Sequence, residues 1–393
     1  MRKALLQAQK GFGATSPNPL VGAVLVKGGK IIGCGWHRRA GLPHAEIEAL
    51  HNARQRGWSA KGATLYVTLE PCCTHGRTPP CTMAIVTAGL RRVVIGAVDP
   101  NPQHGGRGFK ILQNAGIEVV AGILGDECAA LNEAFNHWIV RRTPFVTVKA
   151  AMTLDGKIAT AGGESKWITG EKARAYGMKL RQGSDAILVG VNTVLADDPS
   201  LSVRPSGGKP SSACAAEPAR LRRIVLDSLA RTPVTARVVS DGLARLTTIV
   251  VSRFAPANRV AALADKVNLI VAPLAGSNRK NHNSKLDLAW LLEKLGAENV
   301  TSLLVEGGGE VNASFLLGGH AQRVAFFYAP KILGGRSARK AVAGDGAESL
   351  GRAIQLREVA WRKLGGDLLL TALAGRPDSG AARFGPGALT GKM

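Results

Sequence analysis

Short apolar runs alternate with helical segments along this chain, and the alternation begins twice. In the first part, apolar runs predict strands at 21–26, 30–35, 63–69, 92–98 and 117–121, and the segments between and after them predict helices at 45–56, 82–88, 108–115 and 124–140. This alternation is typical of layered α/β domains, in which helices pack on a sheet. The Arg-Arg-Thr-Pro sequence at 141–144 ends the first pattern.

The second part repeats the alternation with its own set of apolar runs. Strands are expected at 145–151, 184–190, 223–227, 246–251 and 302–306. Gly307, Gly308 and Gly309 follow the last of these and open a helix expected at 310–317. We therefore expect two domains, at 1–142 and 144–374. The inserts at 205–217 and 275–285 are expected to be surface loops, and the Gly-, Ala- and Pro-rich tail at 375–393 to be disordered.

Composition limits the class of protein. The net charge of +23 first suggests nucleic acid as a partner, but the Lys and Arg residues are scattered and aromatic residues make up only 5% of the chain. Clefts for a phosphorylated substrate and cofactor would use the same charge. No apolar run reaches the length of a membrane span, and the N-terminus lacks the apolar core of a signal peptide, so we expect a cytoplasmic protein without membrane contact. We expect four cysteines to be reduced thiols: Cys34, Cys73, Cys128 and Cys214.

Two thiols and one imidazole form a candidate zinc site. His44, Cys72 and Cys81 would supply three ligands and leave a fourth position for water, as in catalytic zinc sites. Glu46, two residues after His44, could move a proton between that water and a leaving amine. The spacing is that of zinc deaminases, H-x-E followed by P-C, with eight residues between the two cysteines. Pro71 is expected to begin a helical element, with Cys72 in its first turn.

Two other readings of these residues stay open at this point. A nucleic-acid-acting deaminase would use the same zinc chemistry on a flipped base, and the positive charge of the chain favours it slightly. A binding module whose zinc only stabilises the fold would need no general base, so Glu46 argues against it. The second domain argues against the nucleic-acid reading, because it would have no part in that reaction.

Longer motifs resemble the bifunctional deaminase-reductases of riboflavin biosynthesis. In the first domain these are Ser-Pro-Asn-Pro-Leu-Val-Gly-Ala-Val at 16–24, His-Ala-Glu at 44–46 and Glu-Pro-Cys through Gly-Arg-Thr-Pro-Pro-Cys at 70–81. In the second they are Lys-Ala-Ala-Met-Thr-Leu-Asp-Gly-Lys-Ile-Ala at 149–159, Val-Glu-Gly-Gly at 305–308 and Ala-Pro-Lys-Ile-Leu-Gly-Gly at 329–335. The resemblance covers nearly all of 1–374 outside the inserts.

The resemblance implies a cytidine-deaminase-like α/β/α domain followed by a dihydrofolate-reductase-like α/β domain. It implies zinc-dependent deamination of 2,5-diamino-6-(5-phosphoribosylamino)pyrimidin-4-one, and then NADPH-dependent reduction of the ribosyl arm to ribityl. One zinc per chain and NADPH would be the cofactors, and a phosphoribosylated pyrimidine the substrate, with no nucleic-acid partner. The sequence leaves the oligomeric state open.

The same resemblance assigns site residues. In the first domain, Asn18 and His37 would orient the pyrimidine ring. In the second domain the cofactor positions are Ala151, Trp167, Thr193, Asp197 and Ser228, with the Gly308–Ser314 turn (Gly308, Gly309, Glu310, Val311, Asn312, Ala313 and Ser314) at the pyrophosphate. Backbone N–H groups at a helix start suit a phosphate. The substrate positions are Ser165, Arg181, Leu201, Arg204 and Glu306, and the planar forks of the two arginines suit a ribose phosphate.

Two places depart from the family pattern. The family usually has His two residues after the first zinc cysteine, where this chain has Thr74, and His75 comes one residue later. This puts the role of that side chain in doubt but leaves the metal ligands unchanged. The family also usually carries an acidic pair where this chain reads Ala-Gln-Arg-Val at 321–324. We expect the second difference to affect packing or a subunit contact, because it touches no assigned catalytic group.

Overall fold

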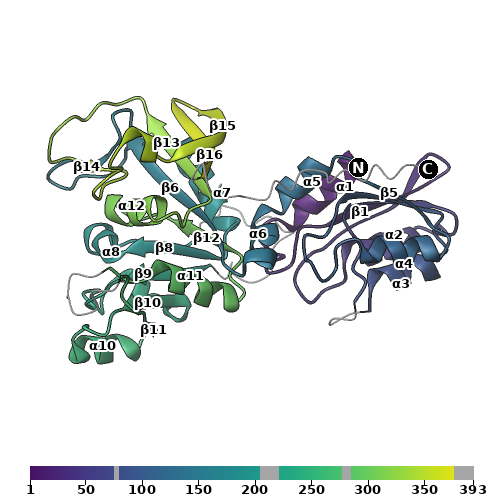
Figure 1. Cartoon of the computed structure of the whole chain (residues 1–393), viewed down its shortest axis with the longest axis horizontal. Helices are drawn as coiled ribbons and strands as arrows, with labels where there is room; N and C mark the ends of the chain where they lie inside the picture. The colour runs from purple at the N-terminus through teal and green to yellow at the C-terminus, as the bar shows by residue number, and fades with distance from the viewer. Residues whose placement is uncertain (75–78, 204–220, 277–284, 376–393) are drawn as a thin grey trace. The chain divides into compact units, whose positions relative to one another are not determined.

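The computed structural model describes residues 1–74, 79–203, 221–276 and 285–375. The chain forms two compact units, which meet in sequence between Arg142 and Thr143 (Figure 1). The whole 205–217 insert and residues 277–284 of the 275–285 insert lie outside the described residues. So do His75, Arg204, Cys214 and the tail after Gly375. Among the described residues, no helix combines the length and the apolar character needed to cross a membrane.

The first unit is built on a five-stranded sheet in the order β2-β1-β3-β4-β5. Its strands are β1 (Gly22–Lys27), β2 (Lys30–Trp36), β3 (Thr64–Leu69), β4 (Arg92–Ala97) and β5 (Glu118–Ala121). β1 pairs antiparallel with both β2 and β3, whereas β3, β4 and β5 are parallel. Because β3 and β4 are parallel, the segments that follow them begin at the same edge of the sheet.

Helices cover both faces of this sheet. They are α1 (Arg2–Ala8), α2 (Ala45–Gln55), α3 (Cys81–Thr87), α4 (Arg107–Asn114), α5 (Gly125–Leu131) and α6 (Glu133–Arg141), with a 3₁₀ turn, η1 (Gln9–Gly11). Residues of α2, α3 and α4 share one core with the sheet, and α1 and α5 lie on the opposite side (Figure 1). Gly22 packs against the backbone of α1 and Gly35 against that of α2, where a Cβ atom would collide. The result is the expected α/β/α arrangement.

The single helix expected at 124–140 is wrong in one respect, because it is broken at Asn132 into α5 and α6. The side chain of Asn132 accepts from the backbone N–H of Leu20 at 2.7 Å and donates to the carbonyl of the same residue at 2.9 Å. Its backbone leaves the helical region, with φ −115° and ψ 25°. A partner more than a hundred residues away in sequence therefore fixes the break.

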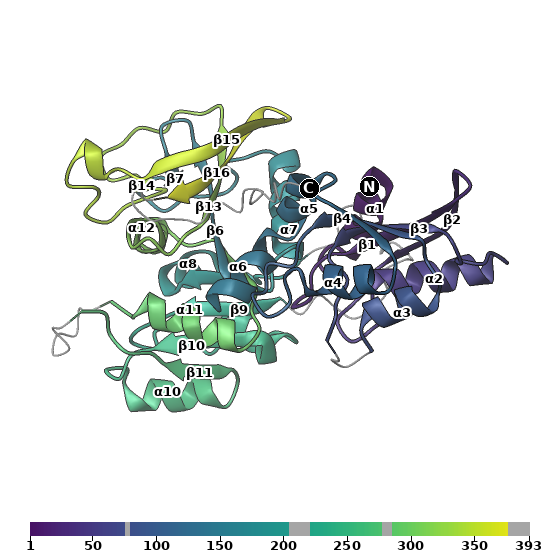
Figure 2. The same ribbon diagram turned by 45° about the vertical axis from the view of Figure 1, so that its right-hand side comes forward.

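The second unit contains a nine-stranded sheet in the order β11-β10-β9-β8-β12-β6-β13-β16-β15. Its strands are β6 (Phe145–Thr153), β8 (Ala186–Gly190), β9 (Arg222–Leu226), β10 (Thr247–Val251), β11 (Asn268–Val271), β12 (Ser302–Val305), β13 (Arg323–Ala329), β15 (Gln355–Leu364) and β16 (Asp367–Gly375). Each neighbouring pair of strands from β11 to β13 in this order is parallel. β16 pairs antiparallel with β13 on one side and with β15 on the other. Figures 1 and 2 show β9, β10 and β11 on one side of β8, and β13, β15 and β16 on the other.

Helices lie on both faces of the second sheet as well. They are α7 (Glu171–Gln182), α8 (Val191–Asp197), α9 (Arg237–Ser240), α10 (Ala257–Ala264), α11 (Leu288–Ala297) and α12 (Gly309–Leu317). The core under α11 and α12 is separate from the core under α8, α9 and α10. A small sheet of β7 (Lys157–Ala159) and β14 (Arg339–Lys340) and the 3₁₀ turns η2 (Ala244–Leu246) and η3 (Leu350–Arg352) complete the unit.

The strand order of this sheet reverses between β8 and β6. After β6 the chain runs outward through β8, β9, β10 and β11, and β12 then returns to lie between β8 and β6. Ligands of open α/β sheets bind at the carboxyl ends of strands where such a reversal occurs. The carboxyl ends of β8 and β12, followed by α8 and α12, are therefore the first place to look for a cofactor.

Candidate functional sites

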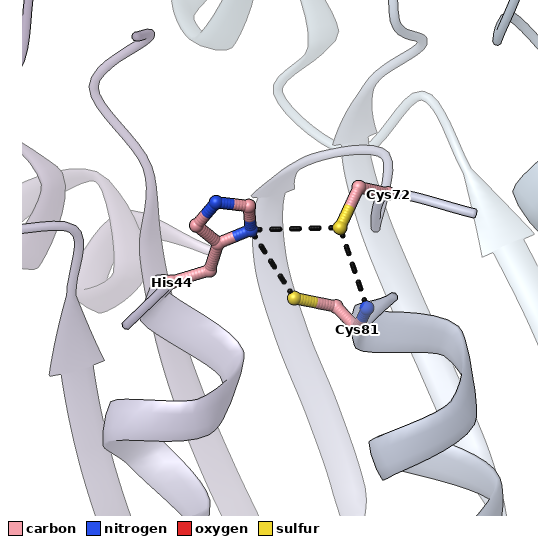
Figure 3. A group of neighbouring side chains, drawn as sticks. All are labelled: His44, Cys72 and Cys81. Atoms are coloured by element: carbon pink, nitrogen blue, oxygen red, sulfur yellow. Dashed lines mark hydrogen bonds between the residues drawn. The ribbon is translucent and has the colours of Figure 1, made fainter. Parts of the chain in front are cut away.

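Three segments of the first unit bring His44, Cys72 and Cys81 together. Nδ1 of His44 lies 3.5 Å from Sγ of Cys72 and 3.3 Å from Sγ of Cys81, and all three ligand atoms lie within 4.8 Å of one another. Figure 3 shows the imidazole facing both sulfurs, with His44 just before α2 and Cys81 at the start of α3. The backbone N–H of Cys81 donates to Sγ of Cys72 at 3.3 Å.

These distances suit a tetrahedral zinc ion. Zinc–nitrogen and zinc–sulfur bonds of usual length, meeting at the tetrahedral angle, place N and S about 3.5 Å apart. The two observed N–S separations, 3.5 and 3.3 Å, agree with that value. A donor set of two thiols and one imidazole is soft enough to favour zinc over magnesium or calcium. Three protein ligands leave one tetrahedral position for water or substrate.

The electrostatics of the cluster favour a thiolate. Hydrogen bonding from the Cys81 thiol, together with His44 and the Cys81 backbone N–H, outweighs burial and lowers the pKa of Cys72 to about 4. The hydrogen bond with Cys72 raises the pKa of His44, against the effect of burial. Sharing its proton with Cys72 and being buried raise the pKa of the Cys81 thiol. A coordinated metal ion would deprotonate both sulfurs.

Glu46 lies in the first turn of α2, beside the cluster. Its side chain is almost fully buried, and its carboxyl group is close enough to His44, Cys72 and Cys81 for each of them to affect its pKa. Burial, followed by the charge of Cys72, raises the pKa of Glu46 to about 7. A bound cation would act in the opposite direction. A buried carboxyl group that can change its protonation near neutral pH is suited to moving a proton.

The structure corrects one expectation about the thiols. Cys72 is not in the first turn of a helix; it lies in the connection after β3, and Cys81 is the first residue of α3. The two prolines before Cys81 extend the connection, so the helix begins only after them. Thr74 is exposed, and His75 lies outside the described residues.

Asn18 and His37 form a pair next to the metal ligands. Nδ1 of His37 lies 3.1 Å from the carbonyl oxygen of Pro43, so this nitrogen carries the proton. Nε2 is then an acceptor, and it receives the side-chain N–H of Asn18 at 3.0 Å. Burial lowers the pKa of His37, which favours the neutral ring. The His37 and His44 rings lie 5.2 Å apart, centroid to centroid. This arrangement fixes the amide of Asn18 with its oxygen pointing away from His37.

Glu70 is a residue of this site that the sequence analysis did not single out. Its carboxylate accepts from the backbone N–H groups of Asp99, Gly106 and Gly108 at 3.2, 3.0 and 2.9 Å. It thereby fastens the loop after β4 to the end of β3, two residues before Cys72. An acidic residue directly after an apolar strand and before Pro-Cys was the signal that could have found it.

In the second unit, Arg181 and Glu306 form a two-point ion pair. Nε and Nη2 of Arg181 lie 2.9 Å from Oε1 and Oε2 of Glu306. Nζ of Lys149 lies 3.5 Å from the same carboxylate. Burial alone would raise the pKa of Glu306, but Lys149 and Arg181 outweigh it and hold the pKa at about 2. Lys149, the lone charge in an otherwise mostly apolar strand, was not singled out from the sequence.

This geometry changes the role that can be assigned to Arg181. The fork expected to hold a ribose phosphate is already paired with Glu306, and Nη1 donates to the carbonyl of Ser202 at 3.0 Å. In this structure the guanidinium of Arg181 is occupied by Glu306 and Ser202, and its contact with substrate stays a prediction. Leu201, between Ser200 and Ser202, is buried. Arg204, the other arginine expected at the substrate, lies outside the described residues.

The glycine turn before α12 has the form of a phosphate cradle. A Cβ on Gly307 would collide with Val311 at 2.5 Å, so this glycine serves packing. A Cβ on Gly308 would meet only Oγ1 of Thr193, at 4.0 Å, and would fill open space. Gly308 precedes the first N–H groups of α12, and Thr193 lies in α8. Open space bordered by free backbone N–H groups is what an NADPH pyrophosphate requires.

Other expected cofactor positions differ in what they contact. Oγ of Ser165 donates to Oδ1 of Asp197 at 3.1 Å, so one expected substrate residue and one expected cofactor residue meet. Asn312 is fully buried and donates to the carbonyl of Ala341 at 2.8 Å. Ala313 is also buried, and the hydroxyl of Ser314 bonds within its own helix. The α12 residues after Val311 therefore support the turn from behind.

The remaining positions are in different elements: Trp167 in the connection between β7 and α7, Ser228 just after β9, and Ala151 within β6. Trp167 is 65% exposed and stacks with Arg174, whose guanidinium is 4.7 Å from the ring centroid. Ser228 follows β9, whose last residue pairs with the last residue of β8. Ala151, in β6, pairs with Phe327 of β13. An exposed ring is available to a ligand, which distinguishes Trp167 from a core aromatic.

Comparison with known proteins places both units in described families. Residues 144–370 match the RibD C-terminal domain family, and residues 1–97 match the cytidine and deoxycytidylate deaminase zinc-binding region. The riboflavin biosynthesis protein RibD of Actinobacillus pleuropneumoniae is 42% identical over 378 residues, covering 94% of this chain and 93% of that protein. RibD of Aquifex aeolicus is 44% identical over 374 residues, covering 94% and 96%.

Solved structures agree with these matches. RibD of Acinetobacter baumannii superposes with a TM-score of 0.81 at 35% identity, covering 95% of this chain and 98% of that one. A diaminohydroxyphosphoribosylaminopyrimidine deaminase/5-amino-6-(5-phosphoribosylamino)uracil reductase of Thermotoga maritima gives 0.77 at 34% identity, covering 95% and 97%. Sequence identity, coverage and fold thus agree over both units, and the chain belongs to the RibD family of bifunctional deaminase-reductases of riboflavin biosynthesis.

Proposed function

We propose that residues 1–142 remove the ring amino group of a diaminopyrimidinone carrying a phosphoribosylamino arm, and that residues 144–374 then reduce that arm to ribityl. The observation that carries the first step is the cluster of His44, Cys72 and Cys81, with its zinc-like spacing, beside the buried Glu46. Family membership supports the order of the two reactions and the use of zinc and NADPH. Family membership therefore favours this function over the alternative, a nucleic-acid-acting deaminase that carries an accessory domain.

In the deaminase site, zinc on His44, Cys72 and Cys81 would supply a water activated for attack near neutral pH. The carboxyl group of Glu46 would take one proton from the attacking water and deliver it to the ring nitrogen, and would then carry the second proton from the new hydroxyl group to the departing ammonia. Glu46 is suited to both transfers because it is buried in the first turn of α2, two residues after His44.

Asn18 orients the pyrimidine in this proposal. His37 holds the amide N–H of Asn18, so the amide oxygen faces the substrate as an acceptor for a ring N–H or an amino group. If the proton of His37 were on Nε2, the amide oxygen of Asn18 would turn toward His37. The amide N–H groups of Asn18, which are donors, would then face the substrate. Glu70 acts one step further out, because it fixes the loop after β4 beside Cys72.

In the reductase site, NADPH would supply the hydride to the sugar carbon that opens. The turn at Gly308 and the first N–H groups of α12 hold its pyrophosphate. Trp167, Thr193, Asp197 and Ser228 surround the rest of the cofactor in this proposal. Glu306 stays ionised between Lys149 and Arg181, so it acts as a fixed acceptor for substrate hydroxyl groups and not as a proton donor.

The experiment that tests this function is direct. The purified chain is incubated with the diaminopyrimidine phosphate, with and without NADPH, and ammonia and product masses are measured. We expect ammonia and the deaminated pyrimidine without NADPH, and the ribityl product only when NADPH is added. Release of ammonia from cytidine or from nucleic acid, with none from the diaminopyrimidine, would overturn the substrate assignment. A cytoplasmic location stays a prediction from the sequence.

A further inference from the structure

We infer that the ion pair between Arg223, which is buried, and the partly exposed Asp241 positions the Ser200–Ser202 segment of the reductase, so that it sets the affinity for the pyrimidine substrate and not for NADPH. This inference rests on the proposed function of the second unit. Neither residue lies at an expected site position: Arg223 is in β9 and Asp241 follows α9.

The Ser200–Ser202 segment is held by two arginines. Nη1 of Arg223 donates to the carbonyl oxygen of Ser200 at 3.0 Å, and Nη1 of Arg181 donates to the carbonyl oxygen of Ser202 at 3.0 Å. The hydroxyl oxygens of Ser200 and Ser202 lie 3.0 Å apart. Both carbonyl groups that flank Leu201 are therefore fixed by charge-assisted hydrogen bonds, which are stronger than neutral ones.

Each arginine is in turn fixed by a carboxylate. Arg181 is paired with Glu306, and Arg223 is paired with both oxygens of Asp241, at 2.7 and 2.8 Å. The remaining contact of Arg223 is to the carbonyl of Val238 at 3.1 Å. A continuous chain of bonds thus runs from Asp241 through Arg223 and the segment to Arg181 and Glu306.

Leu201 shows why the segment needs this support. Its φ of +49° lies in the left-handed region, which is unfavourable for a residue with a side chain. Its side chain is nevertheless buried in the core under α8 and α9. A backbone held in such a conformation persists only where its surroundings determine it, and such positions gather at functional sites.

Stability alone does not account for the pair. Arg223 is 1% exposed, and taking a guanidinium group out of water costs more than a single ion pair usually returns. An apolar residue would fill the same space at less cost. An apolar residue could not, however, hold the carbonyl of Ser200 in place. The position of that carbonyl is therefore a stronger reason for a buried arginine at 223 than stability is.

The consequence for the reductase follows from the chain of bonds. When Asp241 loses its charge, Arg223 is held less firmly and the carbonyl of Ser200 is released. The Ser200–Ser202 backbone then shifts. Because the carbonyl of Ser202 is bonded to Arg181, and Arg181 to Glu306, both of these side chains are displaced. Glu306 and Leu201 are both expected at the substrate, whereas the Gly308 turn is joined to this chain of bonds only through the backbone after Glu306, with no side-chain hydrogen bond between them among the described residues. Small displacements of positioning groups are enough to change rates by large factors.

The chain offers a matched control one residue away. Arg222 is paired with Glu298 at 2.7 Å, on the same strand and with nearly the same bond length, but it does not contact the segment. We therefore compare Asp241→Asn with Glu298→Gln, and Arg223→Met with Arg222→Met. For each variant the KM for the deaminated pyrimidine, the KM for NADPH and the deaminase activity are measured in the full-length zinc-loaded protein.

We expect Asp241→Asn to raise the pyrimidine KM about tenfold, with the NADPH KM within about twofold of the unchanged chain. Arg223→Met should do the same or more, and the two control variants should change neither KM. Deaminase activity shows that each protein is intact, and Asp241→Asn carries the test if Arg223→Met does not fold. An unchanged pyrimidine KM in Asp241→Asn, or an equal rise of both KM values, would overturn the inference. Absence of reductase activity in the unchanged chain would instead overturn the proposed function.

Discussion

The side-chain amide of Asn18 donates to Nε2 of His37 at 3.0 Å, and His37 is itself held by the carbonyl of Pro43. His37 is 2% exposed, so it is a support for Asn18 and not a surface group. In the proposed site, this relationship would determine which atom of Asn18 faces the pyrimidine, and it gives different tasks to two residues that the sequence had placed in one role.

Replacing Asn18 with Ala should weaken the substrate contact. The amide oxygen is lost, and we expect the catalytic efficiency of deamination to fall about tenfold or more, with zinc content unchanged. Steady-state kinetics and metal analysis of the variant check this. Asn114→Ala, at the exposed end of α4, serves as the control. Unchanged efficiency in Asn18→Ala would remove Asn18 from the substrate site.

Replacing Glu46 with Gln should separate metal binding from catalysis. The amide cannot take the proton, so we expect the deamination rate to fall by about a hundredfold or more while zinc is retained. Glu48→Gln, in the same helix and paired with Arg38 at 3.3 Å, should stay close to the unchanged protein. Loss of zinc from Glu46→Gln would make Glu46 a ligand and contradict the role given to it.

Replacing Gly308 with Val tests the phosphate cradle. The backbone at Gly308 accepts a side chain and the space beyond it is open, so the protein should fold, but the new side chain would occupy the place of the pyrophosphate. We expect the KM for NADPH to rise much more than the KM for the pyrimidine. Gly366→Val, where a Cβ also meets open space, is the control. A normal NADPH KM in folded Gly308→Val protein would move the cofactor elsewhere.

His137 should make the first unit sensitive to acid. Burial, and then the charge of Arg141, lowers the pKa of His137 from 6.5 to about 4. As the pH falls below 6.5, the unfolded chain binds a proton that the folded chain does not accept until about pH 4, so stability falls across that window. The loss has an upper limit of about 3 kcal/mol.

The change His137→Gln should therefore flatten the pH dependence of stability. Urea unfolding at about pH 7.5 and about pH 5 measures it. The same substitution at His51, exposed on α2, should leave the dependence as it was. An equal loss of stability with pH in His137→Gln and in the unchanged protein would contradict the assignment.

The parts of the fold that local patterns determine were predictable. The strand ending at Leu69 and the helix starting near Cys81 follow from an apolar run and from the prolines before the cysteine, and they place the thiols near His44. The break at Asn132 was not predictable, because its cause is a hydrogen-bonded partner, Leu20, far away in the sequence. The strands β11, β13, β15 and β16 were also missed, because the sequence analysis followed only the strongest apolar runs.

The second site shows the same limit. The glycine turn and Glu306 were visible as a strand end followed by a helix start, but the partners of Arg181 were not, since Glu306 lies 125 residues further along the chain. The departure at 321–324 has a local explanation in the fold. Gln322 bonds to the backbone of Val146 with both its main chain and its side chain, at 3.0 and 2.8 Å, so it links β13 to β6.

The two sites of this chain should operate separately, and the Cys72→Ser variant shows whether they do. The variant is supplied with NADPH and the deaminated pyrimidine, and NADPH oxidation is recorded. The account predicts a rate close to that of the unchanged protein, although the same sample releases no ammonia from the diaminopyrimidine because the zinc ligand is gone. Loss of NADPH oxidation together with ammonia release, in variant protein that is still folded, would contradict it.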